Sequence, residues 1–169
     1  MIRIETRYSG PVPGVSQRTW APILRSGYRV MGVYHHRSLL PKHFTHAGAR
    51  EYRYTPRSGE SGSGTRKAFR RSYTGRKLAR FGHTRPMVYS GLMEQLSRAR
   101  DLRVTSKGVR VVVHVPAYRG LRQMPDTRIN LREELQTVSA KEGQELTRLF
   151  DRYLDSRLRS MSFSKRVRH

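Results

Sequence analysis

The sequence predicts an α+β fold, in which a small antiparallel sheet with a β-hairpin packs against a long C-terminal amphipathic helix, preceded by an extended N-terminal arm. Three observations predict this fold. Two apolar runs flank a turn within residues 102–115, apolar residues recur three and four positions apart over 130–161, and glycine and proline interrupt residues 1–65. At 169 residues the chain is long enough for one domain with a hydrophobic core.

Residues 1–65 are interpreted as an extended basic arm and loop. Ile2 and Ile4 alternate with polar residues, which favours a short strand. The loose alternation of apolar residues between Trp20 and Tyr34 indicates a second, weakly specified strand, because Gly27 and Gly32 interrupt it. The arm is therefore expected to have little core of its own.

The later part of the arm contains a short helix signal and a flexible run. Ser38 is a candidate helix cap, with apolar residues up to Phe44 turned inward. Residues 58–65 are rich in serine and glycine, which bury little surface, so the main internal boundary is placed there. A phosphate-binding loop at Gly59 and Gly64 would require lysine next, and the chain has Thr65.

Residues 66–169 are predicted to form the α+β core, with the C-terminal helix and a basic tail. Ser90 is a candidate N-cap for a short helix over residues 91–99. Residues 102–105 and 109–115 are predicted to form the hairpin, because valines occupy alternate positions of the second run. Pro116 cannot donate to a strand ladder and should end it.

The last predicted helix begins at Asn130 and extends to about Met161. Asn130 with Glu133 three residues later is a variant of the capping box, which satisfies backbone N–H groups at a helix start. The apolar stripe is interrupted at Glu142 and Gly143, so a bend or break is expected there. Residues 162–169 form the basic tail.

The net charge of +23 indicates an acidic or polyanionic partner, because self-repulsion of this size weakens a free monomer. The predominance of arginine over lysine favours bidentate contacts to carboxylate or phosphate, although a GC-rich genome gives the same bias. The absence of cysteine excludes disulfides and thiolate metal sites. The most apolar run, Val109 to Val115, is too short to span a membrane, so no membrane contact is expected.

The most basic segment covers residues 66–85, where cations alternate with Phe69, Tyr73 and Phe81. Cations neutralise phosphates and aromatic rings stack on unpaired bases, so this pattern indicates nucleic-acid contact. The alternative is a helix whose cations are solvated or pair with acids of a partner protein. The candidate partner or nucleic-acid contacts are Arg66, Lys67, Arg70, Arg71, Arg76, Lys77, Arg80 and Arg85.

No catalytic constellation stands out in the sequence. The sequence shows no recognisable pattern of paired carboxylates, of a nucleophile with its base, or of convergent metal ligands. His35, His36, His43 and His46 form the only histidine cluster, and without cysteine or a nearby acid they are interpreted as exposed residues of the arm. The sequence therefore predicts no enzyme, no metal and no cofactor.

One segment resembles a known family. Residues 85–93 read Arg-Pro-Met-Val-Tyr-Ser-Gly-Leu-Met, which is similar to the Pro-apolar-x-x-Thr/Ser-Gly-x-Leu segment of phage virion-morphogenesis or minor tail (tail-completion) proteins of the head-tail junction, with Met93 in place of the final leucine. A short helix, a valine-rich hairpin and a C-terminal amphipathic helix follow in the family's order, so the resemblance covers roughly residues 50–160. The chain departs from many members because no long N-terminal helix is predicted.

The resemblance implies a non-enzymatic structural protein that forms a homo-oligomeric ring in the virion, after assembly in the host cytoplasm. Its partners would be portal, adaptor or tail-tube proteins at the head-tail junction, and contact with DNA would be possible. The alternative that the composition supports is a ribosomal or other structural-RNA-binding protein, since a high positive charge, an arm and a small α+β core are common there too.

Overall fold

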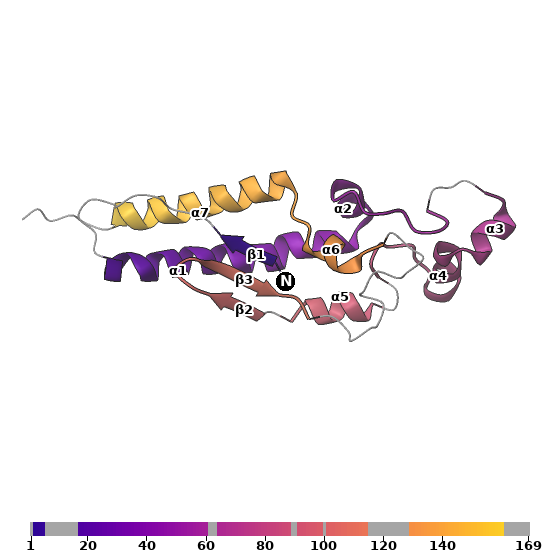
Figure 1. Cartoon of the computed structure of the whole chain (residues 1–169), viewed down its shortest axis with the longest axis horizontal. Coiled ribbons are helices and arrows are strands. Elements are labelled where there is room, and N and C mark those ends of the chain that lie inside the picture. Colours follow the sequence, from indigo (N-terminus) through magenta and orange to yellow (C-terminus); the bar gives the residue numbers. More distant parts are fainter. Residues whose placement is uncertain are drawn as a thin grey trace, which may run out of the picture.

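The computed structural model describes residues 2–5, 17–60, 64–88, 91–99, 101–114 and 129–160. They form a mixed α+β fold, elongated along one axis (Figure 1). In chain order the elements are β1 (Ile2–Glu5), α1 (Gln17–Tyr34), the π-helix η1 (His35–Leu39), the 3₁₀-helix η2 (Leu40–Phe44), α2 (His46–Glu51), α3 (Arg66–Arg71), α4 (Tyr73–Phe81), α5 (Leu92–Ser97), β2 (Asp101–Val104), β3 (Gly108–Val112), α6 (Leu131–Gln136) and α7 (Ala140–Ser160).

The antiparallel sheet has the order β1-β3-β2, so both β1 and β2 are edge strands. The β2–β3 pair is the hairpin that the sequence predicts, with Leu102 opposite Val111 and Val104 opposite Val109. The first strand, predicted from Ile2 and Ile4, is confirmed and pairs with β3 from the far end of the chain. β3 ends at Val112, three residues earlier than the predicted strand.

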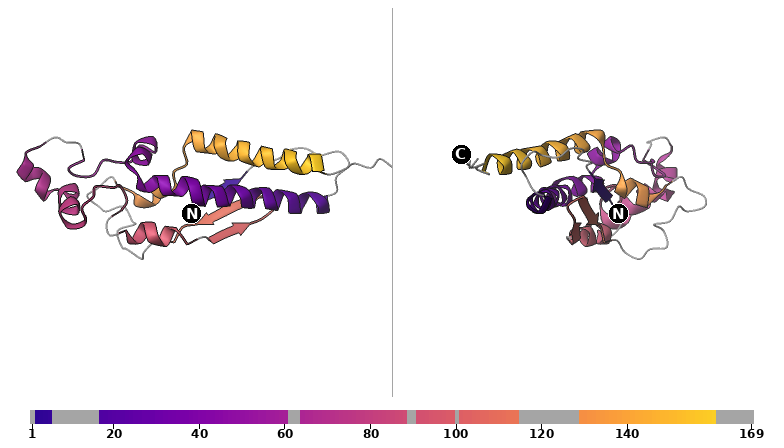
Figure 2. Two further views of the ribbon diagram at one scale, coloured as in Figure 1. Left: turned by 180° about the vertical axis from the view of Figure 1, so that it is seen from behind. Right: turned by 60° about the vertical axis from the view of Figure 1, so that its left-hand side comes forward.

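The sheet and α7 are held together by α1, which lies between them (Figures 1 and 2). The three share one cluster of buried residues, called here the main core: Tyr28, Met31, Leu39, Val109, Leu146, Phe150 and Leu154. The rings of Tyr28 and Phe150 stack with their centroids 4.8 Å apart. Burying side chains of this size stabilises the fold by about 1.5–3 kcal/mol each, so α1 is integral to the core.

The predicted mixed fold, with its small antiparallel sheet and long C-terminal helix, is confirmed, but the extended conformation predicted for the arm is wrong over residues 17–51. The strand expected between Trp20 and Tyr34 is an 18-residue helix. Glycine is unfavourable in the interior of both helices and strands, so Gly27 and Gly32 do not indicate which of the two this segment forms. Both allow close packing: a Cβ on Gly27 would lie 2.7 Å from Phe150, and one on Gly32 would lie 2.7 Å from Val109.

The predicted C-terminal helix is two helices, and the break lies before Gly143 instead of at it. Asn130 caps α6 as predicted, accepting a hydrogen bond from the backbone N–H of Glu133 at 3.2 Å. α7 begins with a second capping box: the backbone N–H of Glu142 donates to Ser139 Oγ, and that of Ser139 donates to Glu142 Oε2, both at 3.2 Å. Ser139 therefore starts a new helix, and Gly143 lies within its first turns.

The two helical glycines Gly32 and Gly143 are expected to respond to alanine with opposite signs. In Gly32→Ala the new methyl group meets Val109 on the central strand, and overpacking outweighs the gain in helix propensity, so stability falls by about 1–2 kcal/mol. No atom of the described residues lies within 4 Å of a Cβ on Gly143, so Gly143→Ala should raise stability by about 0.5–1 kcal/mol. Urea unfolding measures both; equal effects would contradict the packing of α1 on β3.

Two predicted features lie outside the described residues: the Ser90 cap and the basic tail at 162–169. The internal boundary predicted within residues 58–65 stays a prediction. No helix within the described ranges is long and apolar enough to cross a membrane.

Candidate functional site

Six of the eight predicted contact residues lie exposed on a helical hairpin at one end of the molecule. The basic hairpin, defined as residues 66–81, consists of α3 and α4 (Figures 1 and 2). Ser72 joins the two helices, because its Oγ accepts a hydrogen bond from the backbone N–H of Gly75 at 3.0 Å and donates to the carbonyl of Phe69 at 2.6 Å. The exposed cations are Arg66, Lys67, Arg70, Arg71, Arg76 and Arg80.

The other two predicted contacts, Lys77 and Arg85, have structural partners. Lys77 was predicted to contact a partner, but its side chain is only 2 % exposed. Its ammonium group is therefore not part of the outer surface. It donates to the carbonyl of Arg85 and lies 5.6 Å from the ring centroid of Tyr73. Burial lowers the pKa of Lys77 to about 8. Arg85 pairs with Glu94 at 2.8 Å, which ties the end of the basic segment to α5.

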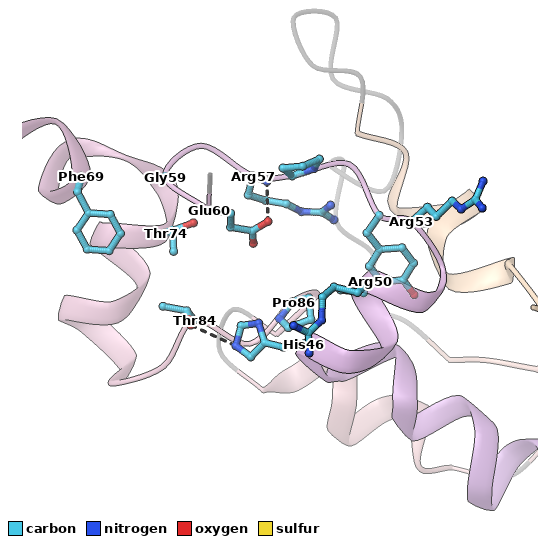
Figure 3. A pocket seen from close by; sticks show the side chains of 13 residues that line it. His46, Arg50, Arg53, Arg57, Gly59, Glu60, Phe69, Thr74, Thr84 and Pro86 are labelled. Carbon is cyan, nitrogen blue, oxygen red and sulfur yellow. Dashed lines mark hydrogen bonds between the residues drawn. The ribbon is translucent and has the colours of Figure 1, made fainter. Parts of the chain in front are cut away.

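A pocket of about 710 Å³ lies between α2 and the basic hairpin (Figure 3). α2 contributes His46 and Arg50 to its lining, and the hairpin contributes Phe69 and Thr74. Glu60 lies on the segment that joins them and accepts a hydrogen bond from the backbone N–H of Arg57 at 2.8 Å. The pocket thus combines charges of both signs with an apolar wall.

Behind this pocket, a buried ion pair connects segments far apart in the sequence. Arg57 and Glu134 form a bidentate contact, in which Nη1 donates to Oε1 at 2.8 Å and Nη2 donates to Oε2. The backbone N–H of Thr55 also donates to Glu134, at 3.1 Å. Burial opposes the charge of Arg57, but the hydrogen bonds and charge of Glu134 outweigh it and raise the pKa of Arg57. The pair fixes the pocket wall to α6.

A second polar cluster is buried beneath α2, around His43. Its Nδ1 contacts the hydroxyl of Tyr54, which itself donates to the carbonyl of Glu134 at 3.0 Å, so His43 carries its proton on Nδ1. The His43 ring also stacks on Tyr52 with centroids 4.1 Å apart. The Tyr52 hydroxyl donates to Glu142 at 2.5 Å. This cluster joins η2, the segment that follows α2, α6 and α7.

The interpretation of the four histidines as exposed is wrong for three of them. His35 and His43 are 0 % exposed, and His36 is 8 % exposed and contacts the Ser97 carbonyl at 3.0 Å. Neither ring nitrogen of His35, nor Nε2 of His43, has a hydrogen-bond partner among the described residues. Burial lowers the pKa of both His35 and His43 to about 4. They are buried because α1 continues into η1 and η2 and turns them inward.

The described residues contain no group of three or more histidine, cysteine, aspartate or glutamate side chains placed to hold a metal ion. The buried histidines belong instead to the packing between η1, η2 and α2. No family model, curated protein or solved structure matches the chain. The geometry of the chain's own residues therefore carries the functional argument.

The residues that sequence reasoning missed lie mostly on α1 and α2. A helical spacing was present in residues 20–35, where aromatic and aliphatic residues recur three and four apart, and it could have indicated α1. The pocket had no sequence signal, since its lining comes from four separate segments between His46 and Pro86. The Arg57–Glu134 pair spans 77 residues, so no local pattern could have found it.

Proposed function

We propose that the chain is a non-enzymatic structural protein of a tailed-phage virion, which forms a ring at the head-tail junction and joins the portal or adaptor to the tail. The observation that carries the proposal is α1. Residues 85–93 are similar to a segment of phage tail-completion proteins, but the sequence predicted no long N-terminal helix, which many members of that family have. α1 is such a helix, and it precedes the similar segment.

The shape and charge of the protomer support the same role. The basic hairpin is at one end of the elongated molecule, so a ring of parallel copies would carry a circle of cations on one rim (Figure 1). Acidic surfaces of portal, adaptor or tail-tube proteins, or DNA, would offset that charge. Among the described residues β1 and β2 are the edge strands of the sheet, and neighbouring copies could associate through their outer backbone groups.

Arg70→Glu combined with Arg71→Glu should spare folding and impair assembly. Both side chains are exposed on α3, so the free energy of unfolding should change by less than about 1 kcal/mol. Reversing their charge places acids where the rim meets an acidic partner or DNA. Negative-stain microscopy of purified protein with its partners counts the rings, and urea unfolding reports stability.

The matched control carries the same change of charge on α1, as Arg25→Glu with Arg29→Glu, which are also exposed. Rings lost equally in both double variants would show a general effect of charge instead of a role for the basic hairpin. Chains that form no rings at all, alone or with partners, would contradict the proposed function.

The basic hairpin also favours a second candidate, a ribosomal or other structural-RNA-binding protein, because Phe69 and Tyr73 lie among its cations. Protein that purifies with RNA, and whose ratio of absorbance at 260 to 280 nm falls after nuclease and high salt, would support this candidate. Nucleic-acid-free protein that forms rings would support the virion protein.

A further inference from the structure

The pocket between α2 and the basic hairpin contains a cation that the fold does not use. Arg50 is exposed, and its side chain makes no hydrogen bond or ion pair with the described residues. Figure 3 shows this side chain reaching toward the pocket between His46 and Pro86. Arg53 lies on the rim of the same pocket, but its side chain extends away from that point. Arg57 also lines the pocket, but its guanidinium is paired with Glu134, so Arg50 supplies the positive charge that is left for a bound group.

The opposite wall carries a polar group that lacks a partner. Thr74 is 4 % exposed, and its Oγ1 has no hydrogen-bond partner among the described residues. In Figure 3 the hydroxyl of Thr74 points toward Glu60. A buried hydroxyl without a partner is unfavourable, so a group that accepts its hydrogen bond would gain affinity.

The remaining residues that line the pocket indicate whether its occupant is a protein or a nucleic acid. Phe69, Tyr54 and Pro86 give the pocket an apolar wall, and its volume of about 710 Å³ suits a few side chains. Glu60 also lines it, and a carboxylate there repels the regularly spaced phosphates of a nucleic-acid strand. Glu60 also repels a single carboxylate, but that one charge can pair with Arg50, whereas a strand would bring further phosphates into the pocket.

We propose that this pocket binds an acidic segment of a partner protein, in which one carboxylate pairs with Arg50 and a neighbouring apolar side chain packs on Phe69 and Pro86. Thr74 donates its hydroxyl hydrogen to a backbone carbonyl of the bound segment. A chain with a net charge of +23 requires acidic neighbours, and the pocket gives one of them a defined position. This inference rests on the proposed function, since it takes the occupant to be another protein of the assembly.

The test uses the full chain and a fluorescein-labelled peptide, Gly-Ser-Glu-Phe-Ser-Gly, with fluorescence anisotropy at about 0.15 M salt. Arg50→Gln should raise the Kd about tenfold or more, since a hydrogen bond to a charged group is lost. Arg53→Gln removes the same charge from the same pocket rim and should change the Kd less than about twofold. The peptide with glutamine in place of glutamate should bind the wild-type chain about as weakly as Arg50→Gln binds the original peptide.

Three outcomes would overturn the inference. The first is that the wild-type chain fails to bind the peptide, and the second is that Arg50→Gln and Arg53→Gln lose the same amount of peptide affinity. The third is that a single-stranded oligothymidylate displaces the peptide and itself binds Arg50→Gln more weakly than the wild-type chain. Imaging the same wild-type protein for rings keeps the two proposals separate. Rings without peptide binding overturn this inference alone, and peptide binding without rings overturns the proposed function alone.

Discussion

Glu134→Ala is expected to lower the free energy of unfolding by about 3–5 kcal/mol, because it leaves the Arg57 guanidinium buried without its counter-charge. The side chains of Arg57 and Glu134 are only 7 % and 9 % exposed, so water cannot replace the lost carboxylate. The backbone N–H of Thr55 loses its acceptor as well. Urea unfolding at neutral pH measures the change.

Glu133→Ala is the matched control, since Glu133 precedes Glu134 on α6 and is exposed. Its free energy of unfolding should change by less than about 1 kcal/mol. Replacing both partners with apolar residues, as Arg57→Met with Glu134→Leu, should recover much of the loss, because no buried charge remains unpaired. A loss below about 1 kcal/mol in Glu134→Ala would show that the pair is accessible to water.

Acidification from pH 7 to pH 4 should weaken the fold by about 3 kcal/mol for each of His35 and His43. Burial lowers both pKa values from 6.5 to about 4. Above pH 6.5 both rings are neutral in the folded and unfolded chain. Between pH 6.5 and 4 the unfolded chain binds the protons first, so stability falls with pH, and below pH 4 this contribution stops growing.

Acid also acts on the rest of the protein, so the measurement compares variants. His35→Leu removes a ring whose nitrogens have no partner among the described residues, and it should be as stable as the wild-type chain at pH 7. Its loss of unfolding free energy between pH 7 and 4.5 should be smaller by about 2–3 kcal/mol. His46→Leu, at an exposed position, should keep the wild-type dependence on pH. Identical profiles for all three proteins would contradict a buried, neutral His35.

The features that the sequence predicted well are those that depend on near neighbours. The β2–β3 hairpin follows from alternating valines around a short turn, and the start of α6 follows from the Asn130 cap. The second capping box, Ser139 with Glu142, was also present in the sequence, but the continuous apolar stripe obscured it. For the basic hairpin the sequence offered a helix only as an alternative, and it did not predict the division into α3 and α4 at Ser72.

The tertiary structure decided the state of α1, for which the spacing of apolar residues and the two glycines gave opposing signals, and it alone decided the polar interior. Gly27 and Gly32 lower the helix propensity of this segment, yet they permit close packing against Phe150 and Val109, and that packing stabilises the helix. The same packing buries His35 and His43 within a segment whose composition suggested a solvated arm. The sequence by itself thus determined the β2–β3 hairpin, the Asn130 cap and the charge, because each arises within a few residues. Only the folded chain determined the packing of α1, the Arg57–Glu134 pair and the pocket at Arg50, because each is formed by groups that are distant in sequence.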